Sequence, residues 1–231
     1  NGVTAREEGY ATHLLRDEAV RLVRERDDER PFLLYLAFTA PHLPNEAPEV
    51  ALAEYAAIAD PRRRAHAAMV TEMDAAIGEV IATLGDEGLL QETLVLFFSD
   101  NGGLNPGVFP EPVQRAVSTV DGWFGESEIP LQVLEFVRVN VMEGAADNTP
   151  LRGGKQSVYE GGIRVPALVN WPGTLPPGEA LGMVTVADVL PTLLAAVGFG
   201  LLGGFGVLAL GGTRLFADPL RADGIMAKKQ S

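Results

Sequence analysis

An α/β fold is predicted by three features of the sequence. Residues 32–38 and 94–99 are apolar runs of strand length that lack alternation, which is typical of strands buried on both faces, as in a parallel sheet. A helical pattern separates these two runs. A third strand at 165–170 and a helix at 188–197 follow, giving the order strand, helix, strand, loop, strand, helix. We therefore expect the three strands to share one mixed or parallel sheet.

Two further helices are indicated by amphipathic spacing and capping. Residues 17–24 place apolar side chains on one side and charges on the other. Asp60 and Pro61 form a cap followed by proline at the first helical position, and apolar residues recur at helical spacing from 69 to 84. Gly85 then closes a helix of about five turns.

Composition excludes several function classes. The chain has 231 residues, a net charge of -13 and no cysteine. Its length suggests one domain or one domain plus a fragment. The negative charge disfavours nucleic acid and anionic lipid as partners. Without cysteine there are no disulfides, zinc-thiolate sites or cysteine nucleophiles, and the redox compartment stays open. The chain starts at Asn1, without a signal peptide pattern, so we expect the middle of a longer protein.

Two segments depart from the regular α/β pattern. Residues 104–149 contain seven acids and two arginines, which predicts a long solvated insertion with one strand or helix near 131–141. Residues 189–213 carry no charge over 25 positions, a length that could cross a bilayer, but seven of them are glycine. We therefore favour a buried helix followed by an unassigned, Gly-rich apolar tail at 199–231 over a membrane span.

Polar side chains follow two of the predicted strands at their carboxyl ends. His42 lies just beyond the first strand, and Asp100 and Asn101 follow the second. Ligands of open α/β sheets bind at this edge, so the three residues could form one site. Asp-Asn-Gly is also favourable turn chemistry, and a histidine after proline can cap a strand. The pattern alone leaves both interpretations open.

Four segments together resemble the sulfatase family, the arylsulfatase-like branch of the alkaline phosphatase superfamily. The resemblance implies an alkaline-phosphatase-like sandwich, in which helices flank a mainly parallel central sheet. It covers 1–198 as part of the catalytic domain, and it implies a secreted, periplasmic or lysosomal location. The segments occur in family order. They are PFLLYLAFTAPHLPNEAPEV at 31–50, LVLFFSDNGG at 94–103, NTPLRGGKQSVYEGGIRVPALVNWPG at 148–173 and DVLPTLLAAVG at 188–198.

The resemblance assigns roles to four residues. Asp100 and Asn101 match the pair that supplies two oxygen ligands of a calcium ion in the family, as suits a hard cation. His42 matches the histidine on the sulfate and leaving-group side, where it would act as a protonated donor. Lys155 matches the lysine that grips the sulfate oxygens. The implied partner is a sulfate ester, either a small molecule or a sulfated glycan.

The family's nucleophile is missing from this sequence. In sulfatases a cysteine or serine in a Cys/Ser-x-Pro-x-Arg segment is converted to formylglycine by a formylglycine-generating enzyme. None of the five serines lies in such a segment, and the paired aspartates that complete the calcium shell are also absent. We therefore expect a fragment with an incomplete calcium site and no nucleophile of its own, whose full-length parent would be the substrate of the modifying enzyme.

Alternative functions and minor site residues remain open at this point. A metal-dependent phosphodiesterase or phosphonate hydrolase of the same superfamily would share the Asp-Asn and histidine pattern, although only three histidines are available as ligands. A noncatalytic module that binds sulfated glycans would explain the absent nucleophile. Arg152 and Arg164 flank the glycine pairs and could assist an anion, but structural ion pairing is the stronger expectation. His13 and His66 are expected to be structural or on the surface.

Overall fold

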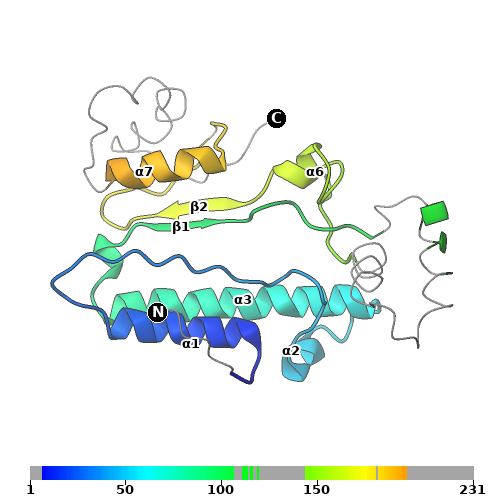
Figure 1. Ribbon diagram of the computed structural model, residues 1–231, viewed down its shortest axis with the longest axis horizontal. Coiled ribbons are helices and arrows are strands. Elements are labelled where there is room, and N and C mark those ends of the chain that lie inside the picture. Colours follow the sequence, from blue (N-terminus) through cyan, green and yellow to red (C-terminus); the bar gives the residue numbers. More distant parts are fainter. Residues whose placement is uncertain are drawn as a thin grey trace. The chain divides into compact units, whose positions relative to one another are not determined.

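The computed structural model describes residues 7–106, 111–113, 115–116, 119, 144–180 and 182–196. The chain divides into two compact units, and each has its own set of elements (Figure 1). The first unit is helical. The second contains the strands. Their bounds are Asn1–Gly88 with Gly103–Thr149, and Leu89–Gly102 with Pro150–Ser231.

The first unit includes the helices α1 (Ala11–Arg24), α2 (Glu49–Glu54) and α3 (Pro61–Asp86). The predicted start of α3 is confirmed: the Asp60 carboxylate accepts hydrogen bonds from the backbone N–H groups of Arg62 and Arg63, at 2.8 and 3.4 Å. The helix has 26 residues, about seven turns rather than five. Its buried face begins at Ala65, before the large apolar residues from which the prediction was made. Helix α1 likewise begins six residues before the predicted helix.

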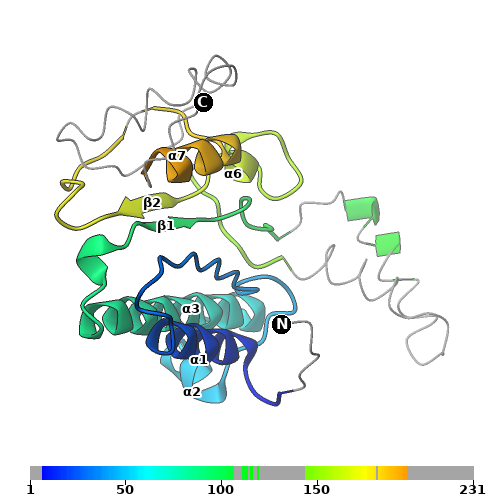
Figure 2. The same cartoon turned by 60° about the vertical axis from the view of Figure 1, so that its left-hand side comes forward.

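Helices α1 and α3 lie side by side and run in the same direction (Figures 1 and 2). Small buried residues, among them Ala19 of α1 and Ala68 and Ala76 of α3, let the two backbones approach closely. Polar pairs follow the same order along both helices, which fixes the parallel alignment. These pairs are His13 with Glu72 at 2.5 Å, Arg16 with Glu79 at 3.1 Å and Arg26 with Glu87 at 3.1 Å.

The segment 31–39 is extended but is not a strand, so the prediction of a buried strand at 32–38 is wrong. Its side chains alternate: Leu33 and Tyr35 are 85% and 82% exposed, whereas Leu34 and Leu36 are half-buried. No neighbouring backbone in the described part of the chain forms a ladder with this segment. An apolar run therefore identified extended backbone correctly, but it could not show whether a second strand lies beside it.

The second unit contains a two-stranded sheet. Strands β1 (Val95–Phe98) and β2 (Ala167–Asn170) confirm the strands predicted at 94–99 and 165–170. They pair antiparallel, with Val95 opposite Asn170 and Phe98 opposite Ala167. The prediction of a mixed or parallel sheet left the direction of this pair open. Apolar composition alone does not fix strand direction, and both strands are only partly buried.

The second unit also contains short helical elements. The helix predicted at 188–197 is confirmed over its described residues, where a capping box between Thr185 and Asp188 opens it. No helix among the described residues is long and apolar enough to span a membrane. The tail at 199–231 and the element predicted near 131–141 lie outside the described residues. The short elements are η1 (Leu90–Glu92), α6 (Glu160–Ile163), η2 (Val186–Asp188) and α7 (Val189–Ala196).

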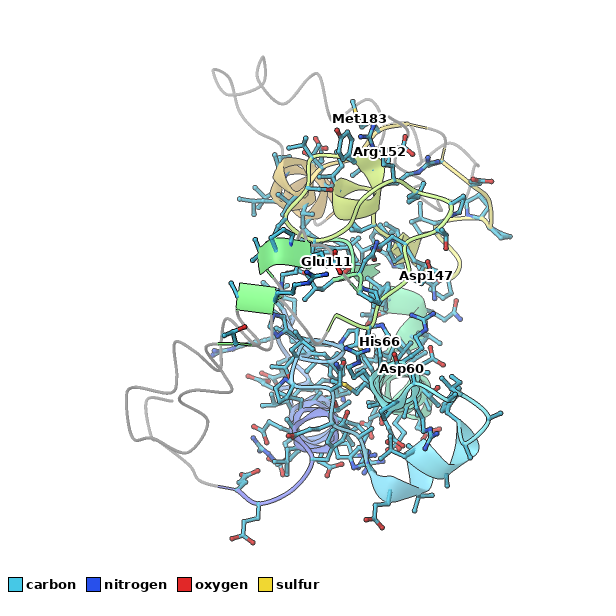
Figure 3. All side chains as sticks on the ribbon, turned by 90° about the vertical axis from the view of Figure 1, so that its right-hand side faces the viewer. Asp60, His66, Glu111, Asp147, Arg152 and Met183 are labelled. Atoms are coloured by element: carbon cyan, nitrogen blue, oxygen red, sulfur yellow. The ribbon has the colours of Figure 1, made fainter. Side chains whose placement is uncertain are left out.

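His66 makes the stability of the first unit depend on pH. Burial within α3, and then the charge of Arg63, lower the pKa of His66 below its usual value (Figure 3). The fold therefore favours neutral His66. Its contribution to stability is complete above the unfolded-state pKa of about 6.5 and is lost as pH falls below that value.

We predict that the free energy of unfolding of the wild-type chain falls relative to that of His66→Gln between pH 7 and pH 5. Urea denaturation followed by circular dichroism at half-unit pH intervals measures the difference. Glutamine keeps a polar amide but does not titrate, so it is the matched control. Parallel curves for the two proteins would contradict the assignment.

Candidate functional site

The turn after β1 is built by the side chains that were predicted to bind a metal. Asp100 Oδ1 accepts a hydrogen bond from the Asn101 backbone N–H at 2.9 Å, and Asn101 Nδ2 donates to the Gly102 carbonyl at 2.9 Å. Ser99 Oγ donates to the Asn101 carbonyl at 3.0 Å. Asp100 Oδ2 and Asn101 Oδ1 accept no hydrogen bond from the described residues. The same two residues can therefore form the turn and still offer two oxygen atoms.

Glycines fix this turn against the segment that carries α6. The Gly102 N–H donates to the Gly162 carbonyl at 2.9 Å. A Cβ atom added at Gly102 would lie 1.7 Å from the Gly161 carbonyl oxygen. No side chain fits at so short a distance, so only glycine permits this contact. The turn that holds Asp100 and Asn101 thus has a defined position relative to residues 161–162.

A second set of glycine contacts fixes the loop of Lys155 to the same residues. The Gly161 N–H donates to the Arg152 carbonyl at 2.8 Å, and a Cβ atom at Gly161 would lie 2.1 Å from the Gly153 carbonyl oxygen. A Cβ atom at Gly162 would meet the Gly154 carbonyl oxygen at 2.5 Å. We call these contacts, among Gly102, Gly153, Gly154, Gly161 and Gly162, the glycine junction. It connects the Asp100–Asn101 turn to the loop that carries Lys155.

The loop at 152–159 has a tightly turned backbone around Lys155. Gly153 and Gln156 both have positive φ values, of 78° and 72°. A positive φ is rare for a residue with a side chain, such as Gln156. The turn that contains Gln156 is closed by a hydrogen bond from the Ser157 backbone N–H to the Gly154 carbonyl at 3.0 Å. Lys155 itself is half-buried. The loop therefore presents Lys155 from a constrained backbone.

His42 belongs to the first unit, whereas Asp100, Asn101 and Lys155 belong to the second. The backbone N–H of His42 donates to the Thr39 carbonyl at 2.8 Å. Its ring Nδ1 lies 2.9 Å from the Leu43 carbonyl. Because a carbonyl oxygen only accepts, Nδ1 must carry a proton in this bond. This bond commits Nδ1 to the Leu43 carbonyl.

The donor set suits a hard cation but is small. Carboxylate and amide oxygens are the ligands that calcium and magnesium prefer, and Asp100 and Asn101 provide one of each. Among the described residues there is no group of three or more His, Asp or Glu side chains placed to hold a metal. Calcium takes about six to eight oxygen ligands. This pair alone therefore supplies a minority of a calcium shell.

The two ends of the insertion at 104–149 are fastened together in the first unit. Asn148 Nδ2 donates to the Gly103 carbonyl at 2.8 Å, and its Oδ1 accepts from the Gly103 N–H at 3.0 Å. The Ala146 N–H donates to the Leu104 carbonyl at 3.0 Å, and Arg63 of α3 donates to the Ala145 carbonyl at 2.8 Å. Asn148 lies in the motif at 148–173, and the sequence pattern predicted no role for it. The Asn148 side chain forms hydrogen bonds with both the N–H and the carbonyl of Gly103.

The two flanking arginines behave differently. Arg164 pairs with Glu160 at 3.2 Å across one helical turn, which confirms the structural interpretation for that residue. Arg152 instead lies over the ring of Tyr159, with its Cζ atom 3.8 Å from the ring centroid. Ion pairing was therefore the wrong expectation for Arg152 within the described residues.

Comparison with known proteins identifies the family. The family model described as Sulfatase matches residues 1–199. The chain belongs to the sulfatase family. It is 32% identical to human arylsulfatase A over 197 residues and 36% identical to mouse steryl-sulfatase over 202 residues. These alignments cover 85% and 84% of this chain, but only 30% and 26% of the relatives. Membership in this hydrolase family confirms the resemblance seen in the sequence.

Solved sulfatase structures share the fold. A structure of Ps i-CgsB in complex with k-i-k-neocarrahexaose matches with a TM-score of 0.72 and 29% identity, over 97% of this chain and 41% of that chain. The putative sulfatase yidJ from Bacteroides fragilis matches with a TM-score of 0.61 at 20% identity, which supports the fold alone. The sulfatase chain is therefore an alkaline-phosphatase-like α/β protein.

We predict that Gly102→Ala and Gly161→Ala each destabilise the second unit by at least about 2 kcal/mol, because the added methyl would force two backbone segments apart. Urea denaturation of each variant measures the loss. Gly78→Ala is the matched control, since a Cβ atom there meets nothing within 4 Å. Its site lies inside α3, so it should stabilise by up to about 1 kcal/mol. Wild-type stability in Gly102→Ala would contradict the glycine junction.

Proposed function

We propose that this chain forms part of the sulfate-binding site of a sulfate ester hydrolase. The observation that carries the proposal is the glycine junction, which brings an oxygen-ligand pair and a lysine into one constrained substructure. Family membership and 32% and 36% identity to an arylsulfatase and a steryl-sulfatase support the reaction class. Hydrolysis of a sulfate ester needs positive groups around the sulfate oxygens, and a bound cation together with a lysine would supply them.

We assign the four candidate residues complementary roles. Asp100 and Asn101 would bind a divalent cation, most consistent with calcium because both ligands are oxygen atoms. When bound, this cation would polarise the sulfate oxygens. Lys155 would neutralise a second part of the sulfate charge. His42, whose Nδ1 is committed to the Leu43 carbonyl, would hold a proton at Nε2 and donate it to the departing ester oxygen.

We also propose that β1 and β2 are part of a larger, mainly parallel central sheet. The match to Ps i-CgsB supports it, because this chain aligns over 97% of its length with less than half of that protein. An antiparallel pair at β1 and β2 is compatible with a sheet of mixed direction.

A sulfated glycan is the substrate class that we favour over a steroid sulfate. The similar structure of Ps i-CgsB contains a neocarrahexaose, and its match to this chain extends over 97% of the residues here.

Only the presence of a nucleophile would allow turnover, and the sequence contains no Cys/Ser-x-Pro-x-Arg segment. Binding, rather than hydrolysis, is therefore the appropriate measurement for this chain.

We predict that calorimetry on the purified chain detects no tight calcium site, with a dissociation constant no lower than about 10⁻⁴ M. Two oxygen ligands replace too little of the hydration shell of the ion. Asp100→Asn removes the carboxylate charge but keeps the turn-forming oxygen, so it should abolish even the weak binding. A submicromolar site that Asp100→Asn abolishes would show that other residues of this chain complete the shell.

We predict that 4-nitrophenyl sulfate binds weakly to the chain and that Lys155→Ala weakens this binding about tenfold, because a charge-assisted contact is lost. Changes in amide NMR shifts during titration measure the dissociation constants. Lys228→Ala removes the same charge elsewhere in the sequence and serves as the control. Equal effects of the two substitutions would mean that only net charge matters, and Lys155 would then have no specific role.

A further inference from the structure

Arg152 has an unusual environment among the described arginines. Apart from Arg24, each of the other described arginines pairs with a carboxylate or donates a hydrogen bond to a backbone carbonyl. Arg152 is exposed and its side chain donates to no acceptor within the described residues. Of the two carboxylates nearest in sequence, Asp147 accepts hydrogen bonds from Thr149 and Glu160 is paired with Arg164. In a chain of net charge -13, an arginine left without a carboxylate is available to an external anion.

The Tyr159 ring holds the guanidinium without using its donors. The Arg152 Cζ atom lies over the ring, 3.8 Å from its centroid. All five N–H groups of a guanidinium lie in its plane, so stacking leaves them directed outward. Tyr159 is 46% exposed, which leaves this stack accessible to solvent. A stacked arginine of this kind is pre-oriented for bidentate binding of a sulfate or carboxylate.

The backbone places Arg152 in the same loop as Lys155. The Arg152 carbonyl accepts the Gly161 N–H at 2.8 Å, so its main chain is part of the glycine junction. The two cations are three positions apart in the sequence, so their Cα atoms lie within about 11 Å of each other. Gly153, with a φ of 78°, turns the chain between them. Figure 3 marks Arg152 within this second unit.

We propose that Arg152, held on the Tyr159 ring, binds a second anionic group of the substrate and makes the site selective for glycans that carry neighbouring sulfates. The proposal rests on the proposed function, because it takes Lys155 as the contact to the first sulfate. Arg152 is then a specificity-determining residue. It adds affinity for a doubly charged ligand and adds nothing for a ligand with a single sulfate.

The test uses two neocarrabioses that differ only in carrying one sulfate or two. Side-chain Nε–Hε NMR signals of the arginines are followed during titration of the full chain, and Arg152→Lys assigns the Arg152 signal. In the wild type the disulfated sugar should bind about three- to tenfold more tightly than the monosulfated one, and it should shift the Arg152 signal. Arg152→Ala should remove this preference without changing the affinity for the monosulfated sugar.

Matched variants separate recognition from a structural role. Arg164→Ala removes a neighbouring arginine that already has a partner, so the preference should persist. Tyr159→Phe keeps the stacking ring and should behave like the wild type, whereas Tyr159→Leu should lose part of the preference. If Arg152→Ala weakens both sugars equally or lowers the melting temperature, Arg152 only supports the loop and the proposal is wrong.

The remaining outcomes distinguish this proposal from the proposed function. A preference that survives in Arg152→Ala overturns the second anion contact while leaving the Lys155 site intact. Monosulfated sugar that binds equally well to Lys155→Ala overturns the proposed function itself. If neither sugar binds the wild-type chain, both proposals fail for this protein.

Discussion

The close approach of backbone to backbone at the glycine junction is the constraint on which the second unit depends. The Gly161 carbonyl oxygen lies where a Cβ atom of residue 102 would be, at 1.7 Å. Such a contact cannot be relieved by a rotamer change, because both partners are main chain. It follows that main-chain contacts alone give the turn of Asp100 and the loop of Lys155 a fixed relation. A site for a charged ligand gains from such a rigid backbone, because the positions of its side chains are set before the ligand binds.

The first unit is held together in a different way. Small residues bring α1 and α3 close, and polar pairs in matching order set the parallel register. The pair of Arg16 and Glu79 is partly exposed, so it specifies alignment more than it stabilises. Burial of the alanines and Val23 supplies the main favourable term. Asn148 forms hydrogen bonds with both backbone groups of Gly103, so the two ends of the insertion at 104–149 lie next to each other.

Local signals could be predicted from the sequence, whereas pairing could not. Asp60 and Pro61 identified the start of α3 because capping depends on adjacent residues alone. The extended segments were found from apolar runs. The antiparallel register of β1 and β2, and the lack of a described partner for residues 31–39, depend on contacts distant in sequence. For the site, the motif gave Asp100 and Lys155 as candidates, but the glycine contacts that join their loops required coordinates. The stack of Arg152 on Tyr159 was not foreseen, because a charge count suggests a carboxylate partner first.

Local charge, rather than net charge, decides how this acidic chain can receive an anion. Charges separated by more than about 8 Å are largely screened at physiological ionic strength. The net charge of the chain therefore says little about the potential at a single loop such as residues 152–159. Within the described part of the second unit, Glu160 is neutralised by Arg164. Arg152 and Lys155 are the charged residues of the segment 152–159, so this loop is locally cationic within an acidic chain and suits the binding of an anion.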